Sequence, residues 1–172
     1  HFESGLQHVS LTAYRSDIDD LIVTVGPLMP GFVYRPENVG QAQIKGATLA
    51  YDGQIGSFKL SASYDYLDPR NEETDKLLPR RARQYGTAAV GQRIDSFEWR
   101  IEMQASDYRY DNVANTTKLP GYAVFNLYGA YNLTSELALF ARINNLFDRD
   151  YQLAADYATS GVNAFVGLRY SP

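Results

Sequence analysis

Few residues of this 172-residue chain have the type and spacing that chemistry requires. The sequence contains no cysteine, which excludes a disulfide framework, a thiolate metal site and a cysteine nucleophile. Its only two histidines, His1 and His8, lie near the N-terminal edge, and no G-x-S-x-G nucleophile elbow accompanies them. Phosphate-loop and zinc-ligand spacings are also missing. We therefore predict no enzyme activity, no cofactor and no metal.

The charged residues do not suggest a reactive centre either. Asp17, Asp19 and Asp20 form an acidic cluster, but the glycine and the spaced glutamate of an EF-hand calcium loop are missing. We interpret this cluster as a solvated strand end. Sixteen basic and 20 acidic residues give a formal net charge of −4, which argues against nucleic acid as a partner.

The elements that carry these residues are predicted to be strands. Apolar and polar residues alternate along four segments, Phe58–Tyr66, Phe97–Ala105, Leu137–Asn144 and Val162–Ser171. A period of two puts the two sets on opposite faces of a sheet. With four weaker candidates, the predicted strands span residues 6–25, 32–52, 54–68, 80–93, 95–110, 120–132, 135–150 and 161–172.

Short and long connections alternate between these strands. The short ones are Asp52–Gly56, Arg93–Ser96 and Asn132–Glu136. The long ones are Gly26–Pro36, Asp68–Pro79, Asp111–Pro120 and Asp148–Gly161. An up-and-down meander with short turns at one rim and long loops at the other produces this pattern, and outer-membrane barrels have it.

Strand length and composition also favour a membrane barrel. Ten residues at ~3.3 Å each, tilted by about 40°, rise about 25 Å, which matches the apolar band of such a barrel. The 14 tyrosines suit its interfacial girdles. We predict an all-β, antiparallel up-and-down transmembrane β-barrel of about eight strands. A soluble β-barrel or sandwich with the same alternation is the alternative.

In the membrane reading, Phe97, Trp99, Ile101 and Met103 face lipid, and Glu98, Arg100 and Glu102 face the lumen. Arg80, Arg81 and Arg83 form the only dense basic group. Two partners fit this group equally well. One is lipopolysaccharide phosphate at the outer rim, and the other is lumen carboxylates such as Glu98 and Glu102.

One segment, Asn144-Asn145-Leu146-Phe147-Asp148-Arg149-Asp150-Tyr151, resembles the NLFD-x-x-Y motif near the C-terminus of TonB-dependent outer-membrane transporters. Further segments resemble the same region of that family in the same order. They are YRSDIDDLI from Tyr14, ENVGQAQIKGATLAYD from Glu37, SYDYLDPRNEETDKLLPRRARQ from Ser63, and the terminal GLRYSP. The resemblance covers essentially the whole chain. SYDYLD-x-RN followed by TD-x-LLPRRARQ is most similar to the vitamin B12 (cobalamin) branch.

This resemblance implies a location in the bacterial outer membrane and a role in nutrient uptake. Residues 1–172 would be the C-terminal segment of a barrel of about 22 strands, without the plug domain. Cobalamin or another large nutrient, TonB acting through the missing plug, and outer-membrane lipid or lipopolysaccharide would be the partners. Members of the family end in an aromatic residue, whereas here Tyr170 is followed by Ser171 and Pro172. We expect the NLFD-x-x-Y segment to be structural, with Leu146 and Phe147 at the outer end of the seventh strand.

Substrate contacts are expected only in the four long connections, because the short turns face the other compartment. A corrinoid is held best by aromatic faces with a few polar groups. The candidates are Tyr34, Arg70, Asn71, Tyr110, Asn112 and Tyr157, of which one or two are expected to matter. Two other functions stay open: a siderophore or haem receptor of the same family, and a self-contained eight-stranded barrel with a structural or adhesive role.

Overall fold

The structure is a computed structural model that describes residues 2–4, 7–28, 33–38 and 40–171. Every regular element in this part of the chain is a strand, and none of the described segments is a helix that could span a membrane. The strands are β1 (Phe2–Ser4), β2 (Gln7–Ile18), β3 (Ile22–Leu28), β4 (Val33–Asn38), β5 (Ala42–Ile55), β6 (Phe58–Asn71), β7 (Gln84–Ile94), β8 (Phe97–Ser106), β9 (Arg109–Tyr110), β10 (Lys118–Leu119), β11 (Tyr122–Asn132), β12 (Leu137–Asn144) and β13 (Asn163–Tyr170).

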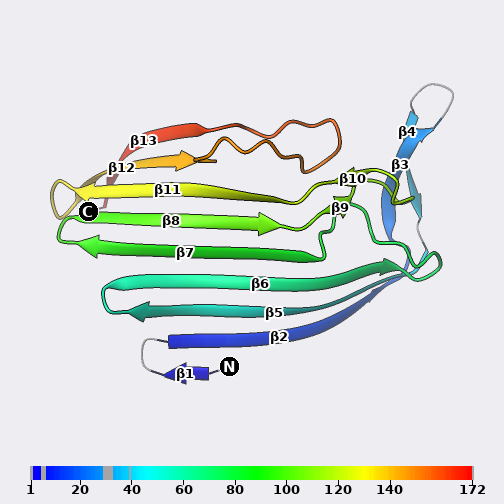
Figure 1. Ribbon diagram of the computed structural model, residues 1–172, viewed down its shortest axis with the longest axis horizontal. Helices are drawn as coiled ribbons and strands as arrows, with labels where there is room; N and C mark the ends of the chain where they lie inside the picture. The colour runs from blue at the N-terminus through cyan, green and yellow to red at the C-terminus, as the bar shows by residue number, and fades with distance from the viewer. Residues whose placement is uncertain (1, 5–6, 29–32, 39, 172) are drawn as a thin grey trace.

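Nine of these strands form one sheet, in the order β1-β2-β5-β6-β7-β8-β11-β12-β13. All neighbours are antiparallel, so the predicted all-β meander is confirmed, with eight long strands and the three-residue β1 at one edge. β3 pairs with β4 and β9 with β10 in two small separate sheets. Figure 1 shows the short turns at the left of the sheet and the long connections, with both small sheets, toward the right.

The predicted boundaries were wrong around the first long connection. The predicted strands 6–25 and 32–52 are shorter in the main sheet, as β2 and β5, and β3 and β4, which lie between them in the chain, pair with each other. Left-handed backbone at Asp20 (φ 58°) and Gly40 (φ 70°) ends the main-sheet ladder on either side of this hairpin. Residues 29–32 of the predicted connection lie outside the described residues.

Other boundaries also shift where the backbone turns left-handed. The first short turn is Gly56–Ser57 rather than Asp52–Gly56, because Gly56 has the positive φ (60°) that tight hairpin turns require. Asp52 instead pairs with Ser61 in the β5–β6 ladder. The second short turn is Asp95–Ser96 (Asp95 φ 51°) rather than Arg93–Ser96, because Arg93 pairs with Glu98 and Ile94 with Phe97 in the β7–β8 ladder. The last predicted strands, 135–150 and 161–172, are shortened to β12 and β13.

The ladder registers sort the sheet into an apolar and a polar face. One continuous row reads Leu60, Val90, Ile101, Leu127, Ile143 and Ala164 across β6, β7, β8, β11, β12 and β13. One residue away on β8, Arg100 and Glu102 form an ion pair (3.2 Å), and Arg142 Nη2 lies 2.5 Å from Glu102. The predicted separation of Trp99 and Ile101 from Arg100 and Glu102 is therefore confirmed.

Few side chains of the sheet itself are buried. On the apolar face Leu11 is 68% and Val166 is 74% exposed. The most deeply buried apolar side chains gather instead toward the long-connection end, where Leu78 and Leu119 are 1% and 3% exposed. This one-layer sheet therefore has its packed interior among its loops and presents a wide apolar face outward.

Candidate functional site

Three of the four long connections are joined into a single assembly. The second loop (72–83) follows β6, the third (107–121) follows β8 and contains β9 and β10, and the fourth (145–162) follows β12. We call these three loops together the outer cap. Figure 1 shows the connection between β9 and β10 at the right of the sheet, beyond the start of β11.

The second and third loops are joined by hydrogen bonds at two places. Asn115 accepts the N–H of Leu77 on its side-chain oxygen and donates its amide to the Leu77 carbonyl, both over 2.9 Å. The N–H of Arg80 donates to the Tyr110 carbonyl (2.6 Å), and its guanidinium Nε donates to Asp111 (2.8 Å). These contacts fix one loop against the other through both backbone and side chains.

The third and fourth loops are joined through Arg109 and Asp111. Asp111 accepts the N–H of Ala155 over 3.1 Å, and Arg109, 4% exposed, donates to the carbonyl of Gln152. The Arg109 guanidinium also lies 5.4 Å from the ring centre of Tyr122. Asp111 therefore contacts both neighbouring loops.

Electrostatics keep the Asp111 carboxylate ionised. Burial by itself raises the pKa of this carboxyl group. Hydrogen bonds from Arg80 and from the N–H of Ala155, with the charges of Arg80 and Arg109, outweigh burial and lower the pKa below the usual 3.8. The joint between the loops is therefore a charged one near neutral pH.

A hollow of about 340 Å³ opens between the second and third loops. Asn71, Lys76 and Leu78 line it on one side, and Val113 and Ala114 on the other. Its size falls in the range of small-molecule pockets, and its lining mixes apolar side chains with a few polar groups. It is the concave feature closest to the predicted substrate contacts.

Two of the predicted contact residues shape the turn that begins the second loop. Asn71, 7% exposed, accepts the N–H groups of Glu73 and Thr74 on its side-chain oxygen, both over 2.9 Å. Arg70 forms ion pairs with Asp68 and Asp75, each at 3.0 Å. Both side chains are thus engaged within their own segment, although Asn71 also borders the hollow.

The remaining four candidates are placed differently. Tyr110 packs edge-to-face on Tyr108 (5.9 Å), and Asn112 is bonded to Thr116 and Thr117 of its own loop. Tyr157 is 72% exposed. Tyr34 lies on β4, and its side chain is outside the described ones. The structure therefore places Tyr110, Asn112 and Tyr157 in the outer cap and Arg70 and Asn71 at the end of β6 where the cap begins, and substrate contact by any of the six stays a prediction.

The NLFD-x-x-Y segment forms the turn that begins the fourth loop. β12 ends at Asn144, so the predicted position of Leu146 and Phe147 at the end of that strand was wrong. Left-handed backbone at Asn145 (φ 50°) and Asp148 (φ 51°) breaks the strand there. The Asn145 side chain is bonded to both backbone groups of Arg149 (2.8 and 3.0 Å) and to Ser160.

The apolar and aromatic members of the motif attach this turn to the sheet. Phe147 packs edge-to-face on Phe125 (ring centres 5.4 Å apart). Tyr151 stacks on Tyr122 (4.3 Å, 30° between the ring planes). The described contacts give the motif the structural role that we expected.

Two arginines of the basic group pair with different neighbours. Arg80 pairs with Asp111, and Arg83 donates to the Tyr66 hydroxyl (2.6 Å) and lies 3.6 Å from Asp68. None of the contacts described for Arg80 and Arg83 is with Glu98 or Glu102, the lumen carboxylates proposed as partners. Glu98 pairs instead with Arg93, and Glu102 pairs with Arg100 and Arg142, because these side chains share the polar face.

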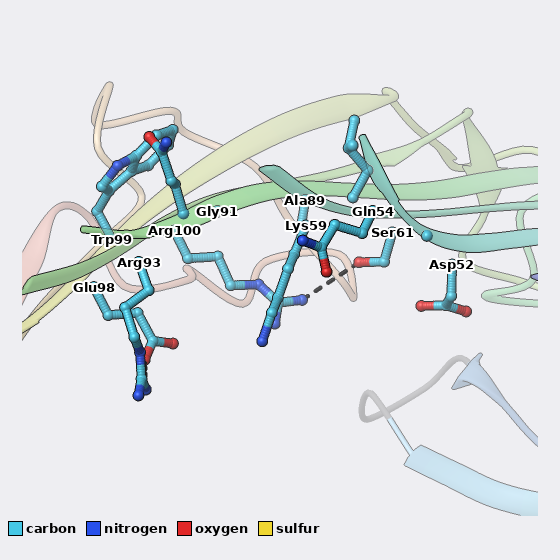
Figure 2. Close-up of a pocket in the computed structure, with 13 residues that line it drawn as sticks. Asp52, Gln54, Lys59, Ser61, Ala89, Gly91, Arg93, Glu98, Trp99 and Arg100 are labelled. Atoms are coloured by element: carbon cyan, nitrogen blue, oxygen red, sulfur yellow. Dashed lines mark hydrogen bonds and ion pairs between the residues drawn. The ribbon is translucent and has the colours of Figure 1, made fainter. Parts of the chain in front are cut away.

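A second hollow, of about 410 Å³, lies on the polar face at the short-turn end, and the sequence analysis did not predict it. Figure 2 shows Lys59 and Arg100 reaching into this space, with Arg100 bonded to Ser61 (3.4 Å). Lys59 and Arg100 stand on either side of Gly91 in the ladder. A Cβ at Gly91 would lie 2.8 Å from the carbonyl oxygen of Trp99, so the neighbouring strand β8 approaches closely at this glycine.

Metal chemistry is not indicated where side chains are described. No group of three or more His, Asp or Glu residues able to hold a metal ion occurs among them. Asp17 is bonded to Arg15 and Gln43, Asp19 to Gln41, and Asp20 to Asn38. The acidic cluster is thus used for pairing at the strand end.

Sequence reasoning missed the residues that hold the cap together, namely Asp111, Arg109, Asn115 and Tyr122. The hydrogen-bond partners of Asp111, Arg109 and Asn115 in the neighbouring loops are 31 to 44 positions away in the chain, and Tyr122 stacks on Tyr151. The one local signal in the sequence was the residue type of Asn115. Asn adopts left-handed backbone more readily than most residues, and Asn115 has a φ of 56°.

Known structures resemble the chain over nearly its full length. It superposes on the siderophore receptor PiuA from Acinetobacter baumannii (23% identity, TM-score 0.77), covering 98% of this chain and 26% of that one. It superposes likewise on the copper transporter OprC (23% identity, TM-score 0.82; 98% and 30% covered). The ferric yersiniabactin uptake receptor FyuA from Yersinia pestis matches at 16% identity and TM-score 0.75 (98% and 28% covered).

At these identities the superpositions show the fold. The chain spans less than a third of the length of each of these proteins. The family of TonB dependent receptor-like β-barrels matches residues 1–146, well over half of the chain. Proteins of this family reside in the bacterial outer membrane. The chain therefore belongs to the TonB-dependent receptor β-barrel family.

Proposed function

We propose that this chain forms the C-terminal part of the barrel wall of an active transporter that imports a large, scarce nutrient across the outer membrane. Family membership and the outer cap support this proposal. Three loops joined through Asp111 and Asn115 form a firm surface at the long-loop rim, where a substrate from outside would first bind. TonB would supply the energy through a plug domain inside the complete barrel.

Cobalamin is the substrate we propose. The segment that resembles the cobalamin branch, Ser63–Gln84, forms the outer half of β6 and the whole second loop. It contributes one wall of the 340 Å³ hollow, including Leu78. A corrinoid is large and partly apolar, so a rim with aromatic side chains and a mixed hollow suits it.

Ferric siderophores are the second candidate, with haem as a related one. PiuA and FyuA, which superpose on this chain with TM-scores of 0.77 and 0.75, are described as a siderophore receptor and a ferric yersiniabactin uptake receptor. At such low identity the substrates of these two receptors cannot be transferred to this chain, because binding residues lie mainly on loops and loops vary most between relatives.

A parallel titration of the intact receptor distinguishes these substrates. Purified receptor in detergent would be titrated with cyanocobalamin, with ferric chelates of the catecholate and hydroxamate classes, and with haem. Saturable, tight binding of cyanocobalamin alone is the expected result. Tight binding of a ferric chelate without cobalamin binding would establish the siderophore function, and failure of all of them would contradict both candidates.

A further inference from the structure

The 340 Å³ hollow between the second and third loops, which we call the cap hollow, has an apolar lining and two charged side chains. The apolar part consists of Leu77, Leu78, Pro79, Val113 and Ala114, and the charged residues are Glu73 and Lys76. Leu78 is only 1% exposed, so it closes the hollow toward the interior of the cap. A group that binds here would have an apolar body with polar atoms at its edge.

Hydrogen bonds fix the apolar lining in place. Both backbone groups of Leu77 are bonded to the side chain of Asn115 over 2.9 Å, and Leu77 also bridges to Arg70. The N–H of Leu78 donates to the carbonyl of Pro69 over 2.9 Å. A surface that is already ordered loses little conformational freedom when a ligand binds to it.

The backbone that carries the two charges is fixed as well. The N–H of Asn71 donates to the carbonyl of Lys76, and the N–H of Asp75 donates to the carbonyl of Asn71, both over 2.9 Å. The side-chain oxygen of Asn71 accepts the N–H of Glu73 over 2.9 Å. Glu73 and Lys76 therefore project from one closed turn.

These two charged groups are available to a ligand. The Glu73 carboxylate and the Lys76 ammonium are exposed, and neither makes a hydrogen bond or ion pair with the part of the chain that the structure describes. The neighbouring Arg70 and Arg80 are engaged by Asp75 and Asp111. The cap hollow thus offers one cation and one anion beside an apolar surface.

The size of the cap hollow limits which part of a large nutrient can enter. At roughly 30 Å³ for each water-sized group, 340 Å³ holds about eleven non-hydrogen atoms. A whole corrinoid is much larger. The flat, methylated two-ring base at the end of the nucleotide arm of cobalamin has about eleven such atoms, and a phosphodiester precedes it in that arm. The corrin ring itself carries amide side chains.

We propose that the cap hollow binds the nucleotide arm of cobalamin, with the base on Leu78 and Val113 and the phosphodiester on Lys76. Glu73 accepts N–H groups from the amide side chains of the corrin ring. This inference rests on the cobalamin function proposed above and adds which part of the substrate these loops recognise. An anionic ferric catecholate would be repelled by Glu73, whereas neutral amides can donate to it.

The test compares two corrinoids on the intact receptor in detergent. Cyanocobalamin has the nucleotide arm, and dicyanocobinamide lacks it. The variants are Lys76→Gln and Ala114→Phe, which removes the cation and fills the cap hollow respectively, with Lys76→Arg as the charge-preserving substitution. Arg149→Gln is the matched control, because Arg149 is an exposed cation of the same cap that does not line the hollow. Hydrogen exchange of the second and third loops checks that the cap stays intact.

Lys76→Gln and Ala114→Phe should each weaken cyanocobalamin binding about tenfold and change cobinamide binding by less than about twofold. Lys76→Arg and Arg149→Gln should bind cyanocobalamin as the parent does. Glu73→Ala should weaken both corrinoids alike, because both carry the ring amides. A free nucleotide with the same base and phosphate should not displace cyanocobalamin at equal concentration.

Equal effects of Lys76→Gln on the two corrinoids, or none on either, would overturn the proposal while leaving cobalamin as the substrate. Displacement by the free nucleotide would also overturn it, because the hollow would then be a site for nucleotides in general. If the parent receptor binds neither corrinoid, the cobalamin function fails and this inference fails with it.

Discussion

Arg80 of the second loop donates its Nε–H to Oδ1 of Asp111 in the third loop over 2.8 Å. The same carboxylate oxygen accepts the backbone N–H of Ala155 in the fourth loop over 3.1 Å. One side chain thus links three loops that are far apart in the sequence.

Replacing Asp111 with Asn should loosen the whole cap rather than one loop. The variant loses the charge that holds Arg80, which should lower the free energy of local opening by about 1–2 kcal/mol. Hydrogen exchange of loop amides in the intact receptor is the measurement. Faster exchange in all three loops is expected, and a change confined to the third loop would contradict the shared joint. Asn112→Ala, which affects the third loop alone, is the control.

The pH dependence of the cap follows from the same residue. The pKa of Asp111 is lowered in the folded protein, so its ionised form is favoured there. Its stabilising contribution is fully present above the ordinary value of 3.8 and is lost as the pH falls through the lowered folded-state pKa. Loop exchange corrected for its intrinsic rate should therefore stay constant from neutral pH down to about pH 4. Opening of the cap between pH 7 and pH 5 would contradict this.

Local pattern was enough to predict the sheet. Alternation along Phe97–Ala105 correctly separated the residues of the apolar face from those of the polar face, because side chains of a strand alternate between the two faces of its sheet. The errors came where the backbone turns left-handed. Asp20, Asn145 and Asp148 are polar residues that look compatible with a strand end, and only their φ values show that the ladder stops there.

The cap could not be predicted in the same way. Its stabilising contacts join residues whose proximity depends on how the strands align, and register is a property of the whole sheet. Asn71 and Asn112 had the right type for substrate contact. The same type also suits Asx turns, and both side chains are used in that way here. Residue type alone therefore does not distinguish an asparagine that contacts substrate from one that stabilises a turn.

Substitution with arginine should have different costs in unfolding free energy on the two faces of β8. Met103 lies on the apolar face at mid-height, whereas Trp99 lies near the short turns and Gln104 lies on the polar face. Met103→Arg should cost about 2–4 kcal/mol of unfolding free energy, Trp99→Arg less, and Gln104→Arg little. Equilibrium unfolding of the intact barrel in lipid vesicles measures these costs. Equal costs at Met103 and Gln104 would show that neither face is in lipid.

The Asn145 substitutions should separate hydrogen bonding from backbone strain. Asn145→Ala removes three side-chain hydrogen bonds and puts alanine at φ 50°, so it should destabilise the barrel by about 3 kcal/mol. Asn145→Gly loses the same bonds without the left-handed penalty and should be about 1 kcal/mol less harmful. Thermal unfolding followed by heat-modifiable mobility provides the comparison. Identical losses in both variants would mean that backbone conformation contributes nothing.

Among the predicted contact residues whose side chains the structure describes, Tyr157 is the most exposed and so the most available to a ligand. It is 72% exposed, whereas Asn112 accepts N–H groups of Thr116 and Thr117 (3.0 and 3.2 Å) within its own loop. Tyr157→Ala should therefore weaken nutrient binding by the intact receptor about tenfold and leave loop protection unchanged, because aromatic anchors contribute strongly at binding surfaces.

Two further variants separate ring contact by Tyr157 from loosening of the third loop. Tyr157→Phe keeps the ring and should bind within about twofold of the parent if ring contact supplies the affinity. Asn112→Ala should increase protease cleavage of the third loop and weaken binding only as far as that loop loosens. The measurement is nutrient affinity together with limited proteolysis, on variants whose barrel assembly has been checked. If alanine at all six candidate positions leaves affinity within about twofold of the parent, the substrate does not contact these loops.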